Sequence, residues 1–298
     1  MAEITRLDSV SAYNKIRGVN TLHPLITVID LSKAKPMPPR TFHFGMYAVF
    51  LKELECGELK YGRKLYDYQE GTLVFIAPGQ ILGIQPGTTT FAPKGWALLF
   101  HPDLIKGTSL GKQIHEYNFF SYEVNEALHL SEKERQMVLD CFYKIQLELQ
   151  QSIDKHSKKL IASNLELFFN YCTRFYDRQF ITRENTNKGI LEKFEALLNG
   201  YFNSDLPQSI GLPTVAYCAE CLHLSPNYFG DLIRRETGQT PQDYIHSKVI
   251  DLAKSRIFDP QKSISEVAYD LGFKYPQHFT RLFKQKVGQA PNEYKRIT

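Results

Sequence analysis

The sequence contains no apolar run that approaches the roughly 20 residues of a membrane-spanning helix, so we expect no membrane partner. Its first residues include Glu3 and Arg6 and have no apolar core, which is unlike a secretory signal. The five cysteines form an odd, scattered set, which argues against a disulfide framework and is typical of a reducing compartment. These absences predict a cytoplasmic protein.

The usual signatures of catalysis are missing as well. No Walker-type loop, Ser-His-Asp arrangement or dinucleotide fingerprint stands out. His23, His43 and His101 are too dispersed in the sequence to indicate a metal site. We therefore expect no catalytic residue, no metal and no cofactor, and predict that the protein is not an enzyme.

The net charge of +4 is small, but most of it lies near the C-terminus. Residues 206–298 contain 12 Lys and Arg against 9 Asp and Glu, whereas the rest of the chain has 24 basic and 23 acidic groups. This distribution modestly favours a polyanionic partner for the last third of the chain. A solvated basic surface explains the same excess equally well.

Residues 22–101 consist of short runs of Val, Ile, Leu, Tyr and Phe that Pro and Gly interrupt. The runs at residues 47–51, 58–61, 65–68 and 73–76 have the length of strands and are separated by turn signals. Strands at this spacing are typical of an all-β barrel or sandwich. We therefore predict that the N-terminal part of the chain is a β-barrel.

The apolar pattern becomes helical from residue 131, where Ser131 and Glu134 form a capping box. A second helix is predicted over residues 157–176, and its apolar arc is wide. That helix either packs on the barrel or forms a subunit interface.

The polar segment at residues 182–189 is the predicted linker between two domains. An apolar-periodic helix follows it and begins the C-terminal domain at residue 190.

The last 90 or so residues contain an internal repeat. A segment that begins at Pro226 aligns with one that begins at Pro276, at an offset of 50 residues. The coinciding pairs are Pro226/Pro276, Phe229/Phe279, Leu232/Leu282, Gly238/Gly288, Gln239/Gln289, Pro241/Pro291 and Tyr244/Tyr294. Upstream the offset becomes 49, which aligns Ala219 with Ala268. The repeat predicts two copies of one structural unit.

Each copy has the pattern of a helix, a tight turn and a second helix. In the second copy Ser263 and Glu266 form a capping box, and Gly272 supplies the left-handed residue that ends the first helix. Pro276 stands at the first position of the next helix, as Pro226 does in the first copy. This pattern predicts two helix-turn-helix units.

The polar residues opposite the apolar stripe of each second helix are candidates for contacts with double-stranded DNA. Gln can pair with adenine and Arg with guanine through two hydrogen bonds, whereas Thr and Lys suit phosphate or mixed contacts. With the residues that flank them, the candidates in the second copy are Lys274, Pro276, Gln277, His278, Thr280, Arg281 and Lys284. Those in the first copy are Asn227, Tyr228, Gly230, Asp231 and Arg234. We expect base readout first from Gln277 and Arg281.

Residues 188–298 resemble the double helix-turn-helix DNA-binding domain of the AraC/XylS family of bacterial transcription regulators. The segment GFKYPQHFTRLFKQKVGQAPNEYK at residues 272–295 is similar to the second signature of that family, and SPNYFGDLIRRETGQTPQDYI at residues 225–245 is similar to the first. The resemblance implies a seven-helix domain whose halves are joined by a long helix over about residues 241–258. It also implies two recognition helices in successive major-groove segments, about one helical turn apart.

The first copy departs from the family pattern at Gly230 and Asp231, where members commonly carry bulky polar or basic residues. Glycine contributes no side chain, and aspartate repels phosphate. Base reading by the first copy is therefore the weaker expectation.

Residues 71–79 and 96–102 more loosely resemble the cupin-like sensor domain of the same family. That resemblance implies a barrel that binds an effector such as a sugar or small metabolite, and following helices that form a dimer contact. Because aromatic side chains suit stacking on a sugar ring or flat metabolite, the ligand candidates include three of them. The ligand candidates are His43, Tyr47, Tyr66 and Trp96, and for each one a place in the barrel core is the alternative.

Cys218 and Cys221 form a Cys-x-x-Cys pair in the first copy of the repeat. Cys218 aligns with an apolar position, Val267, and no second pair of ligands accompanies it. We expect one core cysteine and one surface cysteine rather than a zinc or redox site.

These features predict a two-domain α+β protein. An N-terminal cupin-like β-barrel with flanking helices is expected at residues 1–181, a linker at 182–189, and an all-α domain with two helix-turn-helix motifs at 190–298. The predicted protein is a sequence-specific transcription regulator, modulated by a small-molecule effector, that binds promoter half-sites as a homodimer and acts with RNA polymerase. The alternatives are a regulator that answers to a protein partner, without a small-molecule ligand, and a cupin-type metal enzyme tethered to DNA.

Overall fold

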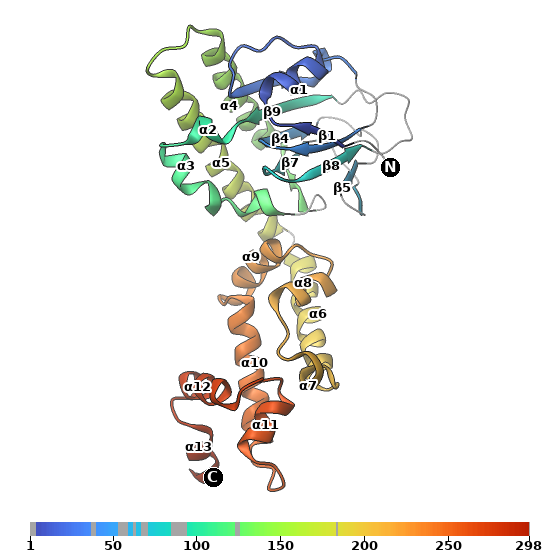
Figure 1. Ribbon diagram of the computed structural model, residues 1–298, viewed down its shortest axis with the longest axis vertical. Coiled ribbons are helices and arrows are strands. Elements are labelled where there is room, and N and C mark those ends of the chain that lie inside the picture. Colours follow the sequence, from blue (N-terminus) through green and yellow to red (C-terminus); the bar gives the residue numbers. More distant parts are fainter. Residues whose placement is uncertain are drawn as a thin grey trace. The chain divides into compact units, whose positions relative to one another are not determined.

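The computed structural model describes residues 4–36, 40–52, 59–61, 64–66, 71–84, 94–122, 126–182 and 184–297. The chain divides into two compact units, Met1–Thr182 and Arg183–Thr298 (Figure 1). The N-terminal unit combines strands with helices, and the C-terminal unit contains helices and no strand within its described residues.

The N-terminal unit contains ten strands within the described residues. They are β1 Ile4–Leu7, β2 Ile26–Asp30, β3 Thr41–Phe44, β4 Tyr47–Lys52, β5 Leu59–Tyr61, β6 Lys64–Tyr66, β7 Thr72–Ile76, β8 Ile81–Ile84, β9 Gly95–Phe100 and β10 Leu128–His129. Its α-helices are α1 Val10–Arg17, α2 Pro102–Ile105, α3 Ser109–Gln113, α4 Glu132–Gln150 and α5 Ser157–Thr182. Three short 3-10 helices lie at Leu31–Lys33, Ile114–Glu116 and Asn118–Ser121.

The described strands form two five-stranded sheets. The first sheet has the order β1-β3-β8-β5-β6 and the second has the order β10-β7-β4-β9-β2. Pairing is antiparallel except between β1 and β3, where Ile4 lies opposite Thr41 in a parallel register. A β-rich N-terminal unit is confirmed, but these strands form two separate sheets, without the closure of the expected cupin-like barrel.

The interior of the N-terminal unit is an apolar cluster that both sheets and α1 contribute to. Phe42 and Phe44 from the first sheet meet Ala48 and Val74 from the second, and Tyr13 of α1 joins them. Because side chains alternate along a strand, the odd-numbered positions of β4 face the other side of the second sheet.

A second apolar layer lies on that other side of the second sheet, where α4 and α5 pack (Figure 1). Phe100 of β9 lies 6.0 Å from Phe169 of α5 between ring centroids, and Phe142 of α4 lies 5.2 Å from Phe168 of α5. The capping box of Ser131 and Glu134 begins α4 as predicted. Helix α5 continues six residues past the predicted end at Tyr176, to Thr182.

The C-terminal unit contains eight helices within residues 184–297, one more than the resemblance implies. They are α6 Glu184–Phe202, α7 Leu206–Ile210, α8 Val215–Cys221, α9 Pro226–Thr237, α10 Pro241–Arg256, α11 Ile264–Asp270, α12 Pro276–Val287 and α13 Pro291–Ile297. Helix α6 begins at Glu184, so most of the segment expected as a loop-like linker is helical. No helix in the described parts of the chain is long and apolar enough to cross a bilayer.

The two predicted helix-turn-helix units are α8–α9 and α11–α12. Ser225 caps α9 by accepting a hydrogen bond from the backbone N–H of Tyr228, and Pro226 occupies the first turn. Ser263 and Glu266 form the predicted capping box at the start of α11. The long helix α10 packs against α9, α11 and α12 and so connects the two units.

The turns of the two units use different residues for the same backbone conformation. Gly272 has a φ of 92° in the second unit, as predicted, whereas the matching position in the first unit is His223, with a φ of 57°. A side chain in the left-handed region costs roughly 1–2 kcal/mol. A Cβ added at Gly272 would lie 2.7 Å from the carbonyl carbon of Gly211, so only glycine fits there.

We predict that His223→Gly stabilises the protein by up to about 1 kcal/mol, because relief of the left-handed strain exceeds the added entropy of the unfolded chain. The matched change Gly272→Ala should destabilise it by about 2 kcal/mol or more, through the clash with Gly211 and the strain combined. Urea unfolding monitored by circular dichroism measures both changes. Shifts of the same sign would contradict this account of the turns.

Candidate nucleic-acid interface

Burial fixes the orientation of the helices α9 and α12. Phe229, Leu232 and Ile233 of α9 are fully buried, and Phe229 lies edge-to-face with Phe194 of α6 at 5.0 Å between ring centroids. The i, i+3, i+4 spacing of these residues places them on one side of the helix. The polar residues between them are therefore directed away from the core.

The outward face of α12 carries amide and cationic side chains. Gln277, Arg281 and Lys284 are exposed, and they lie opposite the buried rings of Phe279 and Phe283. Their positions i, i+4 and i+7 give one continuous stripe along the helix. This stripe has the residue types that read base edges and contact phosphates.

The remaining candidates of the second unit lie around the start of α12. Thr280 is half-buried, and its hydroxyl donates a hydrogen bond to the carbonyl oxygen of Pro276 at 3.1 Å, so that hydroxyl is engaged with the helix backbone. Pro276 occupies the first turn of α12. Lys274 and His278 are exposed. The ammonium of Lys274 lies 5.8 Å from the ring centroid of Tyr275.

Tyr275 itself is missing from the candidates that sequence reasoning identified. Its side chain is 47% exposed and lies 5.5 Å, between ring centroids, from His278. An aromatic residue just before a helix-initiating proline is the sequence signal that could have found it. Together Lys274, Tyr275 and His278 form an exposed group at the N-terminal end of α12.

The outward face of α9 differs in chemistry although its framework is the same. Asn227 and Arg234 are exposed, and Gly230 and Asp231 are half-buried between them. A Cβ added at Gly230 would meet no atom within 4 Å, so packing does not require glycine there. Tyr228 is 5% exposed, so its side chain does not lie on this face.

The two helices also differ in charge. Helix α12 contains Arg281, Lys284 and Lys286 and no acidic residue, whereas α9 contains two arginines balanced by Asp231 and Glu236. Part of the charge of α12 is neutralised, because Lys286 lies 3.6 Å from a carboxylate oxygen of Asp243 on α10. Electrostatic attraction to phosphates therefore comes chiefly from α12.

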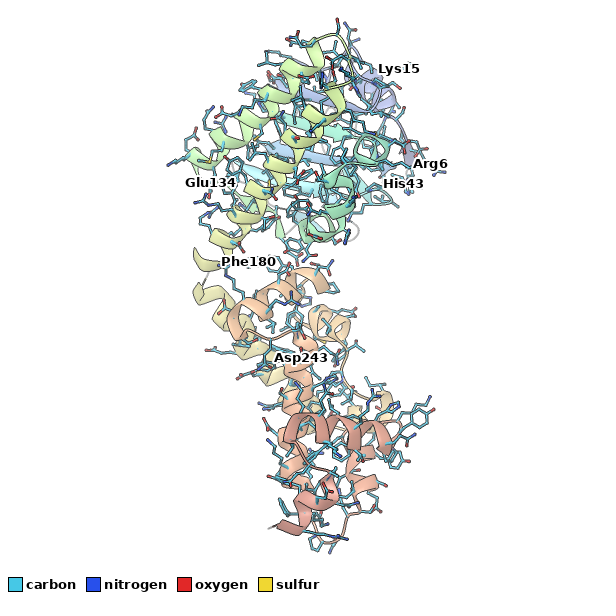
Figure 2. All side chains as sticks on the ribbon, turned by 90° about the vertical axis from the view of Figure 1, so that its left-hand side faces the viewer. Arg6, Lys15, His43, Glu134, Phe180 and Asp243 are labelled. Atoms are coloured by element: carbon cyan, nitrogen blue, oxygen red, sulfur yellow. The ribbon has the colours of Figure 1, made fainter. Side chains whose placement is uncertain are left out.

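The ligand candidates of the N-terminal unit do not form one cluster. His43 lies on the first sheet between Phe42 and Phe44, which face the interior, so its side chain faces the opposite side (Figure 2). The Nδ1 atom of His43 is buried and has no hydrogen-bond partner among the described residues. The side chain of Tyr66 lies outside the described part of the structure.

Tyr47 and Trp96 both belong to the layer between the second sheet and the helices. Tyr47 stacks on Phe100 at 4.9 Å between ring centroids, and burial raises the pKa of its phenol. Trp96 is 8% exposed and lies edge-to-face with Tyr143 of α4 at 5.2 Å. The positions of these two rings agree with the core role that was the alternative for each.

The two cysteines of the Cys-x-x-Cys pair lie as expected. Cys218 is fully buried, and Cys221 is exposed. Burial raises the pKa of the Cys218 thiol to about 12, so this thiol stays protonated at neutral pH.

Comparisons with known proteins agree with this geometry. Residues 218–297 match a family model described as a helix-turn-helix domain. A probable transcriptional regulator LumQ of Photobacterium leiognathi is 29% identical over 147 residues, which cover 49% of this chain and 51% of the relative. The XylDLEGF operon transcriptional activator 3 of Pseudomonas putida is 28% identical over 116 residues, covering 38% of this chain and 34% of the relative.

Among solved structures, the C-terminal domain of AraT, a response regulator from Geobacillus stearothermophilus, is 25% identical to this chain. The match covers 37% of this chain and 85% of that domain, with a TM-score of 0.33. The chain spans about half of the length of the Photobacterium regulator and about a third of the length of the Pseudomonas activator.

The fold and the matched region define the class of the C-terminal unit as a double helix-turn-helix domain, in which α10 connects two units that each present one helix outward. Its second helices begin at Pro226 and Pro276, where the repeat predicts them. The C-terminal part of the chain thus contains an AraC-type helix-turn-helix domain.

Proposed function

We propose that the protein is a sequence-specific DNA-binding transcription regulator. The observation that carries this proposal is the exposed stripe of Gln277, Arg281 and Lys284 on α12, opposite a buried aromatic face within a helix-turn-helix unit. The names of the curated relatives, a transcriptional regulator and an operon activator, support it. The protein acts by binding rather than catalysis, in the compartment that holds the DNA.

In this proposal α12 is the principal reading helix. The planar guanidinium of Arg281 suits the two acceptors of a guanine, and the amide of Gln277 suits the donor and acceptor of an adenine. Lys284, one turn further along, suits a phosphate as a point charge. Helix α9 enters the adjacent major-groove segment, about one helical turn away, and contributes through Asn227 and Arg234.

The N-terminal unit is proposed to sense an effector and to dimerise. We assign residues 1–181 to a cupin-like sensing domain, 182–189 to the connection and 190–298 to DNA binding. Exposed apolar side chains on both α4 and α5, among them Leu147 at 60% and Leu160 at 48%, support a homodimer contact through these helices. Effector binding would shift how a dimer presents its recognition helices to promoter half-sites, and so the recruitment of RNA polymerase.

We predict that Arg281→Ala weakens binding to the preferred site by roughly 1–3 kcal/mol and relaxes the preference at one base pair, because a bidentate contact to a guanine is lost. Lys284→Ala is the matched control, and it should weaken binding to all sequences alike and lower the salt dependence. Fluorescence anisotropy with the preferred duplex and its single-base variants measures both. Uniform weakening by Arg281→Ala would assign Arg281 to a phosphate instead.

We predict that Asp231→Ala leaves DNA affinity unchanged or raises it, because the carboxylate repels phosphate on a helix with little net charge. The same anisotropy titration measures this change at two salt concentrations. A large loss of affinity would show that Asp231 accepts a hydrogen bond from a cytosine or orders a neighbouring side chain.

Selection from a random duplex pool with the full-length protein at moderate salt, followed by sequencing, tests the proposed function. We expect a motif with two blocks about one helical turn apart, of which the block read by α12 is the more specific. Specificity confined to the α12 block would mean that α9 contributes only backbone contacts. Absence of any enrichment, with and without cell extract as a source of effector, would contradict the proposal.

A further inference from the structure

Arg17 is a fully buried arginine in the N-terminal unit. It is the last residue of α1, and its side chain belongs to the stripe Val10, Tyr13, Asn14 and Arg17 that faces inward. The spacing of these residues places them on one side of the helix. Val10 and Tyr13 from this stripe are members of the interior apolar cluster, so the buried side of α1 that carries Arg17 is the side that contributes to that cluster.

Within the described residues, the guanidinium of Arg17 has no hydrogen-bond partner. Its Nε, Nη1 and Nη2 atoms are all buried and none makes a hydrogen bond. The backbone nearby is well ordered by contrast, since the carbonyl oxygen of Arg17 accepts a hydrogen bond from the backbone N–H of Lys35 at 2.8 Å. The side chain of Asn14, one turn earlier, donates from Nδ2 to Thr21 but leaves its buried Oδ1 without a donor.

Another arginine of the same unit shows what a satisfied guanidinium looks like in this protein. Arg178 of α5 donates from Nε and Nη2 to the two carboxylate oxygens of Glu134, at 2.8 and 2.9 Å. It also donates to the carbonyl oxygen of His129 at 2.6 Å. Arg178 is part-buried and forms these three hydrogen bonds, whereas Arg17 is more deeply buried and has none of this kind.

The positive charge of Arg17 is neither lost by deprotonation of its guanidinium nor neutralised by an ionised Tyr13. Burial lowers the pKa of Arg17, but arginine remains protonated in proteins at neutral pH. Burial also raises the pKa of Tyr13, its neighbour on the helix, to about 12, so that phenol is neutral and can only act as a dipole. Buried charges are ordinarily paired, because an isolated one is strongly unfavourable.

We propose that Arg17 is the anchor for the carboxylate of a small ligand with an apolar body, bound in the interior of the N-terminal unit. This inference rests on the proposed function, because the ligand would be the effector of the regulator. A carboxylate matches a guanidinium in charge and offers two acceptors in the same plane. A phosphate dianion would leave a second, unpaired negative charge beside a fully buried side chain, so burial favours the monoanion.

The same geometry supplies a physical reason for a switch. Because the guanidinium is completely covered, a ligand reaches it only when the interior opens beside α1. The closed state contains an unpaired buried charge, and the ligand-bound state contains a hydrogen-bonded ion pair. That difference in free energy favours the open state in the presence of ligand, which is what a population shift requires.

The test is thermal unfolding of the full-length protein with acetate, benzoate and decanoate, each against its amide at equal ionic strength. We expect at least one carboxylate, and none of the amides, to raise the melting temperature of the wild type by several degrees. Arg17→Met should abolish this rise, and Arg17→Lys should retain a smaller one because an ammonium makes no bidentate contact. Lys15→Met, an exposed cation on the same helix (Figure 2), is the matched control and should keep the full response.

The ligand-free variants provide a second measurement. Replacing an unpaired buried charge by an apolar side chain of similar length should leave the melting temperature of Arg17→Met equal to or above that of the wild type. The proposal is overturned if no carboxylate stabilises the wild type, or if Lys15→Met loses the response to the carboxylate. It is also overturned if Arg17→Met retains that response, melts at a lower temperature than the wild type, or does not fold. Enrichment of a DNA motif by the wild type is scored separately, so failure of the carboxylate assay alone rejects only the role of Arg17.

Discussion

The burial of one phenylalanine in the first turns of each recognition helix determines what the rest of the C-terminal unit can do. Phe229 and Phe279 are both fully buried, at equivalent positions of α9 and α12. Each ring removes a large apolar area from water, and no polar residue at that position could substitute for it without loss of stability. With this position fixed inward, helical periodicity directs the residues one and two places after it outward. The identity of the outward residues is then free to vary.

That freedom explains how one framework carries two different surfaces. Phe229 and Ile233 of α9 correspond to the buried Phe279 and Phe283 of α12. The outward residues, by contrast, change from Gly230 and Asp231 in the first unit to Thr280 and Arg281 in the second. Framework and recognition are separable because they occupy opposite sides of the same helix. A regulator can therefore keep both units folded while concentrating its positive charge, and with it most of its attraction to DNA, on one of them.

The sequence predicted those features of the fold that local interactions decide. The capping boxes at Ser131 and Ser263 and the left-handed turn at Gly272 depend on residues within four positions of one another, and the structure confirms all three. Features decided by distant contacts were not accessible. Alternation along β4 showed that Tyr47 and Ala48 face opposite sides, but not which side is the interior. Polar composition suggested a linker at residues 182–189, whereas most of that segment lies in α6, because polar residues such as Glu and Lys are also good helix formers.

Arg17 shows that the sequence alone also could not predict every candidate functional residue. A basic residue in the last turn of a helix is an ordinary feature, since it interacts favourably with the carbonyl end of the helix dipole. Only the folded structure shows that this one is buried and that, among the described residues, it has no hydrogen-bond partner such as Glu134 is for Arg178. An unpaired buried charge stores free energy that a specific ligand can release, whereas a paired one only stabilises the fold. The two arginines thus differ in what they can do because of pairing alone, and the unpaired one is where the N-terminal unit can respond to its surroundings.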